Sequence, residues 1–90
     1  MNDLIHKTIS GVDKKTIDHF NAVSNLVNLI EDAYPGEMTG DDRKMLEVYI
    51  GRIVTAVATN QIDPFSGVND IDQALRLAEA GVPDFLDLIE

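Results

Sequence analysis

The positions of the prolines constrain this sequence most, because they divide it into segments of helix length. Pro35, Pro64 and Pro83 are the only prolines among the 90 residues. Proline interrupts a helix interior, and it pushes the residue before it out of the helical region. Between these breaks, apolar residues recur every three or four positions, which is the spacing of one buried helix face. The sequence therefore predicts an all-α protein, a small helical bundle that forms a single domain over residues 1–90.

Three main helices are expected, at about residues 14–33, 40–59 and 64–80, with short helical pieces at both termini. In the first, Asp13 would be the N-cap, since a side-chain oxygen there accepts a hydrogen bond from a free backbone N–H. Thr39 and Asp63 are the corresponding expected caps of the other two. The third helix would end at Gly81 in a left-handed conformation, which glycine adopts without steric cost.

The expected core combines one apolar face from each main helix. Its central residues would be Phe20, Val27, Leu46, Ile53 and Leu75. A chain of this length buries only about 60–65% of the surface of its unfolded form. It contains no cysteine, so no disulfide reinforces that core. We therefore expect self-association, as a homodimer or a higher oligomer, to contribute to stability.

The charge of the chain limits its possible partners. The net charge is −9, and residues 60–90 hold seven acids against Arg76 alone. Such a surface repels nucleic acid and anionic lipid, so direct binding to either is not expected. No apolar run approaches the ~20 residues that span a bilayer, which favours a cytoplasmic protein. The acidity suits a basic protein partner, or serves solubility only.

Catalytic, metal and cofactor sites are not expected. The serines have no histidine neighbour at a spacing that suggests a general base, and the carboxylate pairs occupy cap positions or polar faces. His6 and His19 are the only histidines and fit no metal motif. His19 falls within the apolar arc of its helix. It is interpreted as a hydrogen-bonded residue at the edge of the bundle, with a pH-sensitive contact as the alternative.

A line of asparagines is the first candidate interaction surface. Asn21, Asn25 and Asn28 follow i, i+4, i+7 spacing on the polar side of the first main helix. Asparagine is a poor helix former, whereas amides offer donors and acceptors without charge. The line is interpreted either as a recognition surface or as a solvated face.

A line of small residues on the second main helix is the other candidate. Gly51, Thr55 and Ala58 share one side, with Val48 beside them. A glycine within a helix costs about 1 kcal/mol relative to alanine, which suggests a packing reason. The line could contact a terminal helical piece of the same chain or the same helix of a second subunit.

These observations favour a small, acidic, non-enzymatic protein–protein interaction module that self-associates. The alternative is an acidic decoy, or inhibitor, that occupies a nucleic-acid-binding surface on another protein. In overall character the chain resembles small helical proteins of the phage type, and such acidic decoys are encoded by viruses and mobile elements. No motif carries that resemblance.

Overall fold

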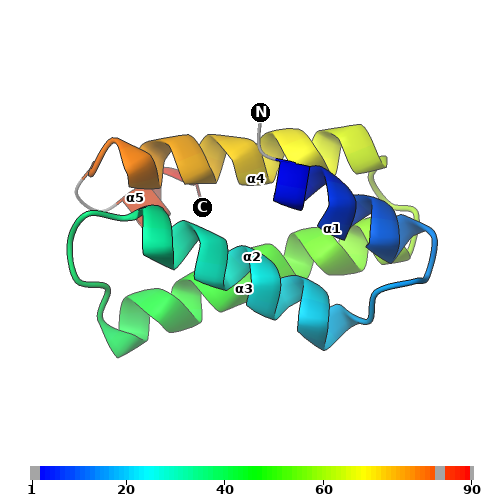
Figure 1. The fold of residues 1–90 in the computed structure, drawn as a ribbon, viewed down its shortest axis with the longest axis horizontal. Coiled ribbons are helices and arrows are strands. Elements are labelled where there is room, and N and C mark those ends of the chain that lie inside the picture. Colours follow the sequence, from blue (N-terminus) through cyan, green and yellow to red (C-terminus); the bar gives the residue numbers. More distant parts are fainter. Residues whose placement is uncertain (1–2, 83–84, 90) are drawn as a thin grey trace.

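The computed structural model describes residues 3–82 and 85–89, and the regular structure in this part of the chain is helical throughout. In chain order the helices are α1 (Asp3–Asp13), α2 (His19–Ala33), α3 (Gly40–Ala58), α4 (Pro64–Glu79) and α5 (Phe85–Ile89). Helices α2, α3 and α4 run along the length of the molecule, while α1 and α5 lie at opposite ends (Figure 1). The prediction of an all-α fold is confirmed.

The helix boundaries predicted for the first half of the chain are wrong. The N-terminal piece is a helix of 11 residues with five of them buried, and the helix predicted from residue 14 begins at His19. Lys15 adopts a left-handed conformation with φ of 64°, and the N–H of Thr16 donates to the carbonyl of Gly11 at 2.8 Å. These bonds satisfy the last carbonyls of α1 and end it. The N-cap of α2 is then Asp18 and not Asp13.

A residue in the left-handed conformation also ends α3 and α4. Asn60 has a φ of 61°, and Gly81 has a φ of 68°, which confirms the prediction for that glycine. The bonds that close these ends run from Gln61 N–H to the Ala56 carbonyl and from Val82 N–H to the Leu77 carbonyl, at 2.8 and 3.2 Å. Pro83, the expected stop, lies outside the described residues.

The predicted N-caps of α3 and α4 are confirmed. The Thr39 hydroxyl accepts from the backbone N–H of Asp42 at 3.1 Å, and the Asp63 carboxylate accepts from that of Ser66 at 2.9 Å. Both caps have extended backbone, as an N-cap requires. The helices predicted at 40–59 and 64–80 therefore agree with α3 and α4 to within one residue.

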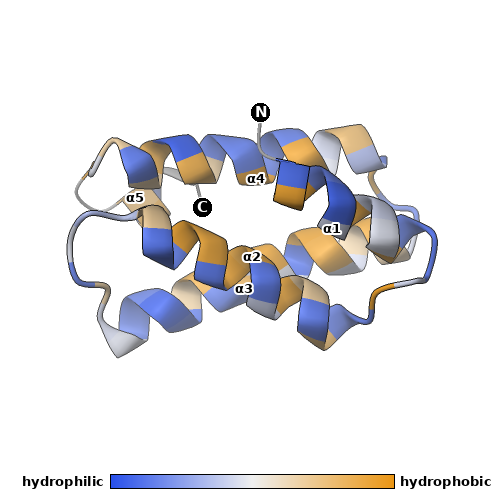
Figure 2. Cartoon of the chain, viewed as in Figure 1, coloured by the Kyte–Doolittle hydropathy of each residue, from blue (hydrophilic) through white to orange (hydrophobic). Residues whose placement is uncertain are grey.

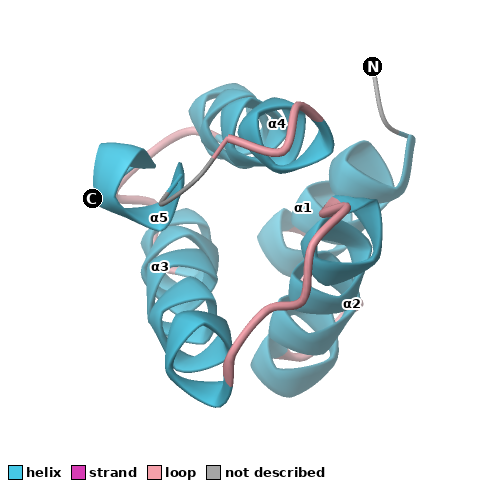
Figure 3. Cartoon of the chain, turned by 90° about the vertical axis from the view of Figure 1, so that its left-hand side faces the viewer, coloured by secondary structure: helices cyan, strands magenta, loops and turns pink. Residues whose placement is uncertain are grey.

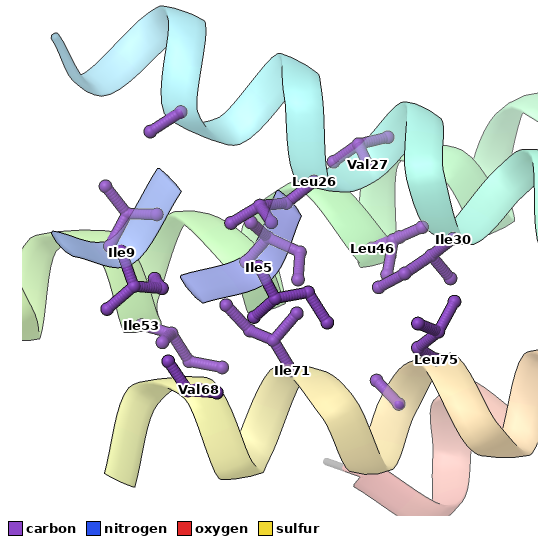
Figure 4. Close-up of a cluster of buried hydrophobic side chains, with 14 of the residues drawn as sticks. Ile5, Ile9, Leu26, Val27, Ile30, Leu46, Ile53, Val68, Ile71 and Leu75 are labelled. Carbon is purple, nitrogen blue, oxygen red and sulfur yellow. The ribbon is translucent and has the colours of Figure 1, made fainter. Parts of the chain in front are cut away.

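The core lies between the main helices, and α1 completes it. Ile5 and Ile9 are fully buried and lie against Val68 and Ile71 of α4 (Figure 4). The hydrophobic sides of the helices face inward and their polar sides face outward (Figure 2). Four of the five expected core residues are buried, namely Val27, Leu46, Ile53 and Leu75.

The fifth expected core residue, Phe20, is 86% exposed, so its prediction is wrong. Phe65, which also falls on an expected buried face, is 77% exposed. Both phenylalanines are the second residue of a helix, α2 and α4 respectively. Because each Cα–Cβ bond tilts toward the helix N-terminus, a side chain in the first turn points past the end of the helix.

Candidate interaction surfaces

The two ends of the bundle differ in chemistry. The α1–α2 and α3–α4 connections meet at one end (right in Figure 1), which we call the aromatic end, residues 10–22 and 54–68. The α2–α3 connection and α5 meet at the other, which we call the acidic end, residues 29–46, 74–82 and 85–89.

Two phenylalanines distinguish the aromatic end. Among the described residues, Phe20 and Phe65 are the most exposed of the large hydrophobic side chains. This end carries three acids against Lys14 and Lys15, so its charge is nearly balanced. Two of those acids, Asp18 and Asp63, are N-caps. An N-cap carboxylate is stabilised by the partial positive charge of the helix N-terminus.

A groove of about 280 Å³ lies beside Phe65, between α1 and α4. It is lined by residues of both helices, including Ile9, Asp13, Phe65 and Val68. Phe65 therefore combines an exposed ring with an adjoining concave surface, an arrangement that suits contact with another protein. The sequence contained a signal for this exposure, namely the position of each phenylalanine two residues after an aspartate N-cap.

The acidic end concentrates the negative charge. Its described residues include seven acids against Arg43, Lys44 and Arg76. Arg43 makes a salt bridge of 2.7 Å to Glu31 and one of 3.4 Å to Glu47. The hydrogen bond and charge of Glu31 chiefly, with those of Glu47, raise the pKa of the Arg43 guanidinium. These pairs are about one-third exposed, so they add little stability, and the net negative charge of this end remains.

The predicted asparagine line is exposed along α2, and two of its members have partners within the chain. The Asn21 amide donates to the Asp18 carboxylate at 2.9 Å, and the Asn28 oxygen accepts from Arg43 at 3.2 Å. Asn25 is exposed on the same line. The two outer asparagines therefore make hydrogen bonds within the chain, to the N-cap Asp18 and to Arg43, and the recognition hypothesis stays a prediction.

The predicted small-residue line is divided in two. A methyl group added at Gly51 would meet no atom within 4 Å, so the hypothesis of a close helix contact within the chain is wrong at this residue. The other two members face the α1–α2 connection. The carbonyl of Ala58 accepts from the Lys15 ammonium at 2.6 Å, and the Thr55 hydroxyl lies 3.2 Å from Nε2 of His19. Contact across a subunit axis stays a prediction for Gly51.

His19 occupies the edge position expected for it. The residue is exposed, and the Thr55 hydroxyl is the hydrogen-bond partner of its Nε2 atom. The hydrogen bond expected of an edge histidine is therefore present, and the alternative of a pH-sensitive contact stays a prediction.

Glycine packing at the start of α4 was not foreseen from the sequence. A methyl group at Gly67 would lie 2.9 Å from Cγ2 of Val57 and 3.5 Å from Cγ2 of Ile53. Gly67 therefore permits close approach of α4 to α3 at the aromatic end.

Searches for other kinds of site give negative findings. Within residues 3–82 and 85–89, no three histidine, aspartate or glutamate side chains gather as they would around a metal ion. None of the described helices is both long and apolar enough to cross a lipid bilayer. Comparison with protein families, curated proteins and solved structures finds no match to this chain.

Proposed function

We propose that this protein is a non-enzymatic protein–protein interaction module that self-associates through its aromatic end. The observation that carries the proposal is the exposure of Phe20 and Phe65 at the end where charge is most nearly balanced. Two copies that meet there keep their acidic ends apart, which minimises repulsion between chains of net charge −9.

The area available is sufficient for a weak or moderate interface. A phenylalanine buries about 150–250 Å² when it is covered, so four rings in a symmetric pair supply on the order of 600 Å² or more. A stable interface buries about 1,200–2,000 Å² in total. The backbone and polar surface around the two rings would provide the remainder in a two-fold arrangement.

Sedimentation equilibrium on the wild type and on the Phe20→Ser, Phe65→Ser double variant tests the proposal. We expect a concentration-dependent dimer mass for the wild type and a monomer mass for the double variant. Val48→Ser is the comparison variant for the other candidate interface, the Gly51 side of α3, and should leave the dimer mass unchanged, because Val48 is 50% exposed on α3 outside the aromatic end. A wild-type protein that stays monomeric at every concentration, or a double variant that still dimerises, contradicts the proposal.

A second candidate is supported by the acidic end. Seven acids against three bases give this region the charge that a basic, nucleic-acid-binding protein would recognise. In this function the protein is an acidic decoy that covers such a surface on its partner. Complexes of this kind are expected to dissociate as salt is raised from low to high concentration, because salt screens exposed charges.

A further inference from the structure

Helix α5 covers the acidic end, and two of its described side chains are buried there. Phe85 and Leu86 are 3% and 5% exposed, and α5 packs beside α3 and α4 (Figure 3). The helix has five residues, whereas isolated helices shorter than about 12–15 residues are marginal in water. The helical structure of α5 therefore depends on the surface on which it lies.

That surface, which we call the α5 seat, consists of Tyr34, Met38 and Met45. The rings of Tyr34 and Phe85 lie with their centroids 5.6 Å apart. A pocket of about 80 Å³, partly open to solvent, lies between α5 and the seat. Methionine side chains adapt readily to different neighbours. The seat therefore accepts a Phe-Leu pair without being filled by it.

The charge of α5 does not match the charge around its seat. Asp42 of α3 and Asp87 of α5 line the same pocket. The chain contains no lysine or arginine after Arg76. Glu37 and Asp41 are close in sequence to the seat residues, as are Lys44 and Arg43, of which Arg43 is paired with Glu31 and Glu47. Like charges at this end repel one another, so α5 fits the seat by shape and apolarity only.

We propose that the α5 seat is a docking site for a basic amphipathic helix of a protein partner, and that α5 is a built-in competitor which the partner displaces. A helix with a Phe-Leu pair and lysines or arginines beside it would keep the apolar contacts of α5. It would also replace repulsion by attraction. The inference rests on the interaction function proposed above, but it concerns the acidic end and does not require self-association.

Peptide binding to the full-length chain tests the inference. The probe is a fluorescent peptide of residues 80–90 that carries Asp84→Lys, Asp87→Lys and Glu90→Lys. Fluorescence anisotropy at low salt should show saturable binding, at least about tenfold tighter than binding of the unchanged acidic peptide. A basic peptide with the same residues in scrambled order should not compete. Equal binding of the scrambled peptide overturns the proposal.

Variants of the full-length chain test displacement. Phe85→Ala should weaken the competitor and lower the Kd of the basic peptide about threefold or more, because the free seat becomes more populated. Leu86→Ala should also lower this Kd. It replaces Phe85→Ala in the test if circular dichroism shows that Phe85→Ala does not fold. Met45→Asp should raise the Kd by placing a charge in the seat, whereas Phe65→Ala, at the aromatic end, should leave it unchanged.

An unchanged Kd in both α5 variants overturns the proposal, as does an effect of Phe65→Ala as large as theirs. Sedimentation of each variant gives its mass and so shows whether the protein still self-associates. Failure of the docking site can then be told apart from failure of self-association. A protein that dimerises normally but does not bind the basic peptide contradicts only the docking site.

Discussion

The aromatic end and the acidic end are closed by different means. At the aromatic end, left-handed turns at Lys15 and Asn60 satisfy the last carbonyls of α1 and α3, and Ile17 and Ile62 then pack on the core. The acidic end has one such turn, at Gly81, and is covered in addition by side chains of the five-residue helix α5. Backbone closure belongs to the cooperative fold, whereas a short docked helix can open locally. We therefore expect the aromatic end to be the rigid end and the acidic end to open more readily.

The largest expected effect is at Ile53, which lies next to the aromatic end and is 7% exposed. Ile53→Ala should lower the free energy of unfolding by about 2–5 kcal/mol, through lost burial and a new cavity. Phe85→Ala, although it removes more atoms, should lower it by only about 1 kcal/mol, because local opening of α5 limits the loss. Urea denaturation of both variants measures the two losses in the free energy of unfolding. Equal losses would remove the contrast between the two ends.

Gly67 provides the second test of the rigid end. Gly67→Ala should lower the free energy of unfolding by about 1–2 kcal/mol, since overpacking against Val57 exceeds the gain in helix propensity. Thermal unfolding monitored by circular dichroism reports the change. An increase in melting temperature would show that α3 and α4 can separate at the aromatic end as readily as α5 can move.

Gly51 is the matched control for Gly67, because both glycines lie within helices. Space around Gly51 is open, so Gly51→Ala should raise the free energy of unfolding by about 0.5–1 kcal/mol through helix propensity alone. The same thermal measurement applies. A loss of stability, or of dimer mass in sedimentation, would reveal a contact at Gly51 across a subunit interface.

The smallest expected effect concerns Tyr49, which connects α3 to α4 between the two ends. Burial, and secondarily the charge of Asp70, raise the pKa of the Tyr49 phenol above its usual value of 10.0. Its contribution to stability is fully present below pH 10 and is lost as the pH rises through the raised pKa. Urea denaturation should therefore show a smaller alkaline loss of stability in Tyr49→Phe than in the wild type. Identical alkaline profiles would contradict this assignment.

Sequence pattern predicted the second half of the fold better than the first, for a physical reason. Thr39 with Asp42 resembles a capping box, and Asp63 precedes a proline at the first helical position, so the sequence indicated where α3 and α4 begin. Both Asp13 and Asp18 can cap a helix, and only the left-handed turn at Lys15 selects between them. Non-glycine residues rarely adopt that conformation, so local sequence gives little warning of it.

The candidate surfaces were predicted less well, because exposure depends on neighbours that the pattern does not specify. The periodicity placed Phe20 on a buried face, although a first-turn side chain extends beyond the helix that would cover it. The seat formed by Tyr34 and Met45 could not be predicted, because its residues meet only when the chain folds. Gly51 was correctly identified as unusual, but its open surroundings could be established only from the structure.

The pairing of α1 with α4 has a consequence for the order in which the chain folds during synthesis. Ile5 and Ile9 leave the ribosome before Ile71 of α4, which packs against them and follows after two intervening helices. Pairing of segments so distant in sequence is slow, and apolar surface exposed in the meantime favours aggregation. In a nascent chain halted after α3, the isoleucine stripe of α1 can pack on α2 and α3 but lacks its cover from α4, and a chaperone that binds apolar segments would find its target there.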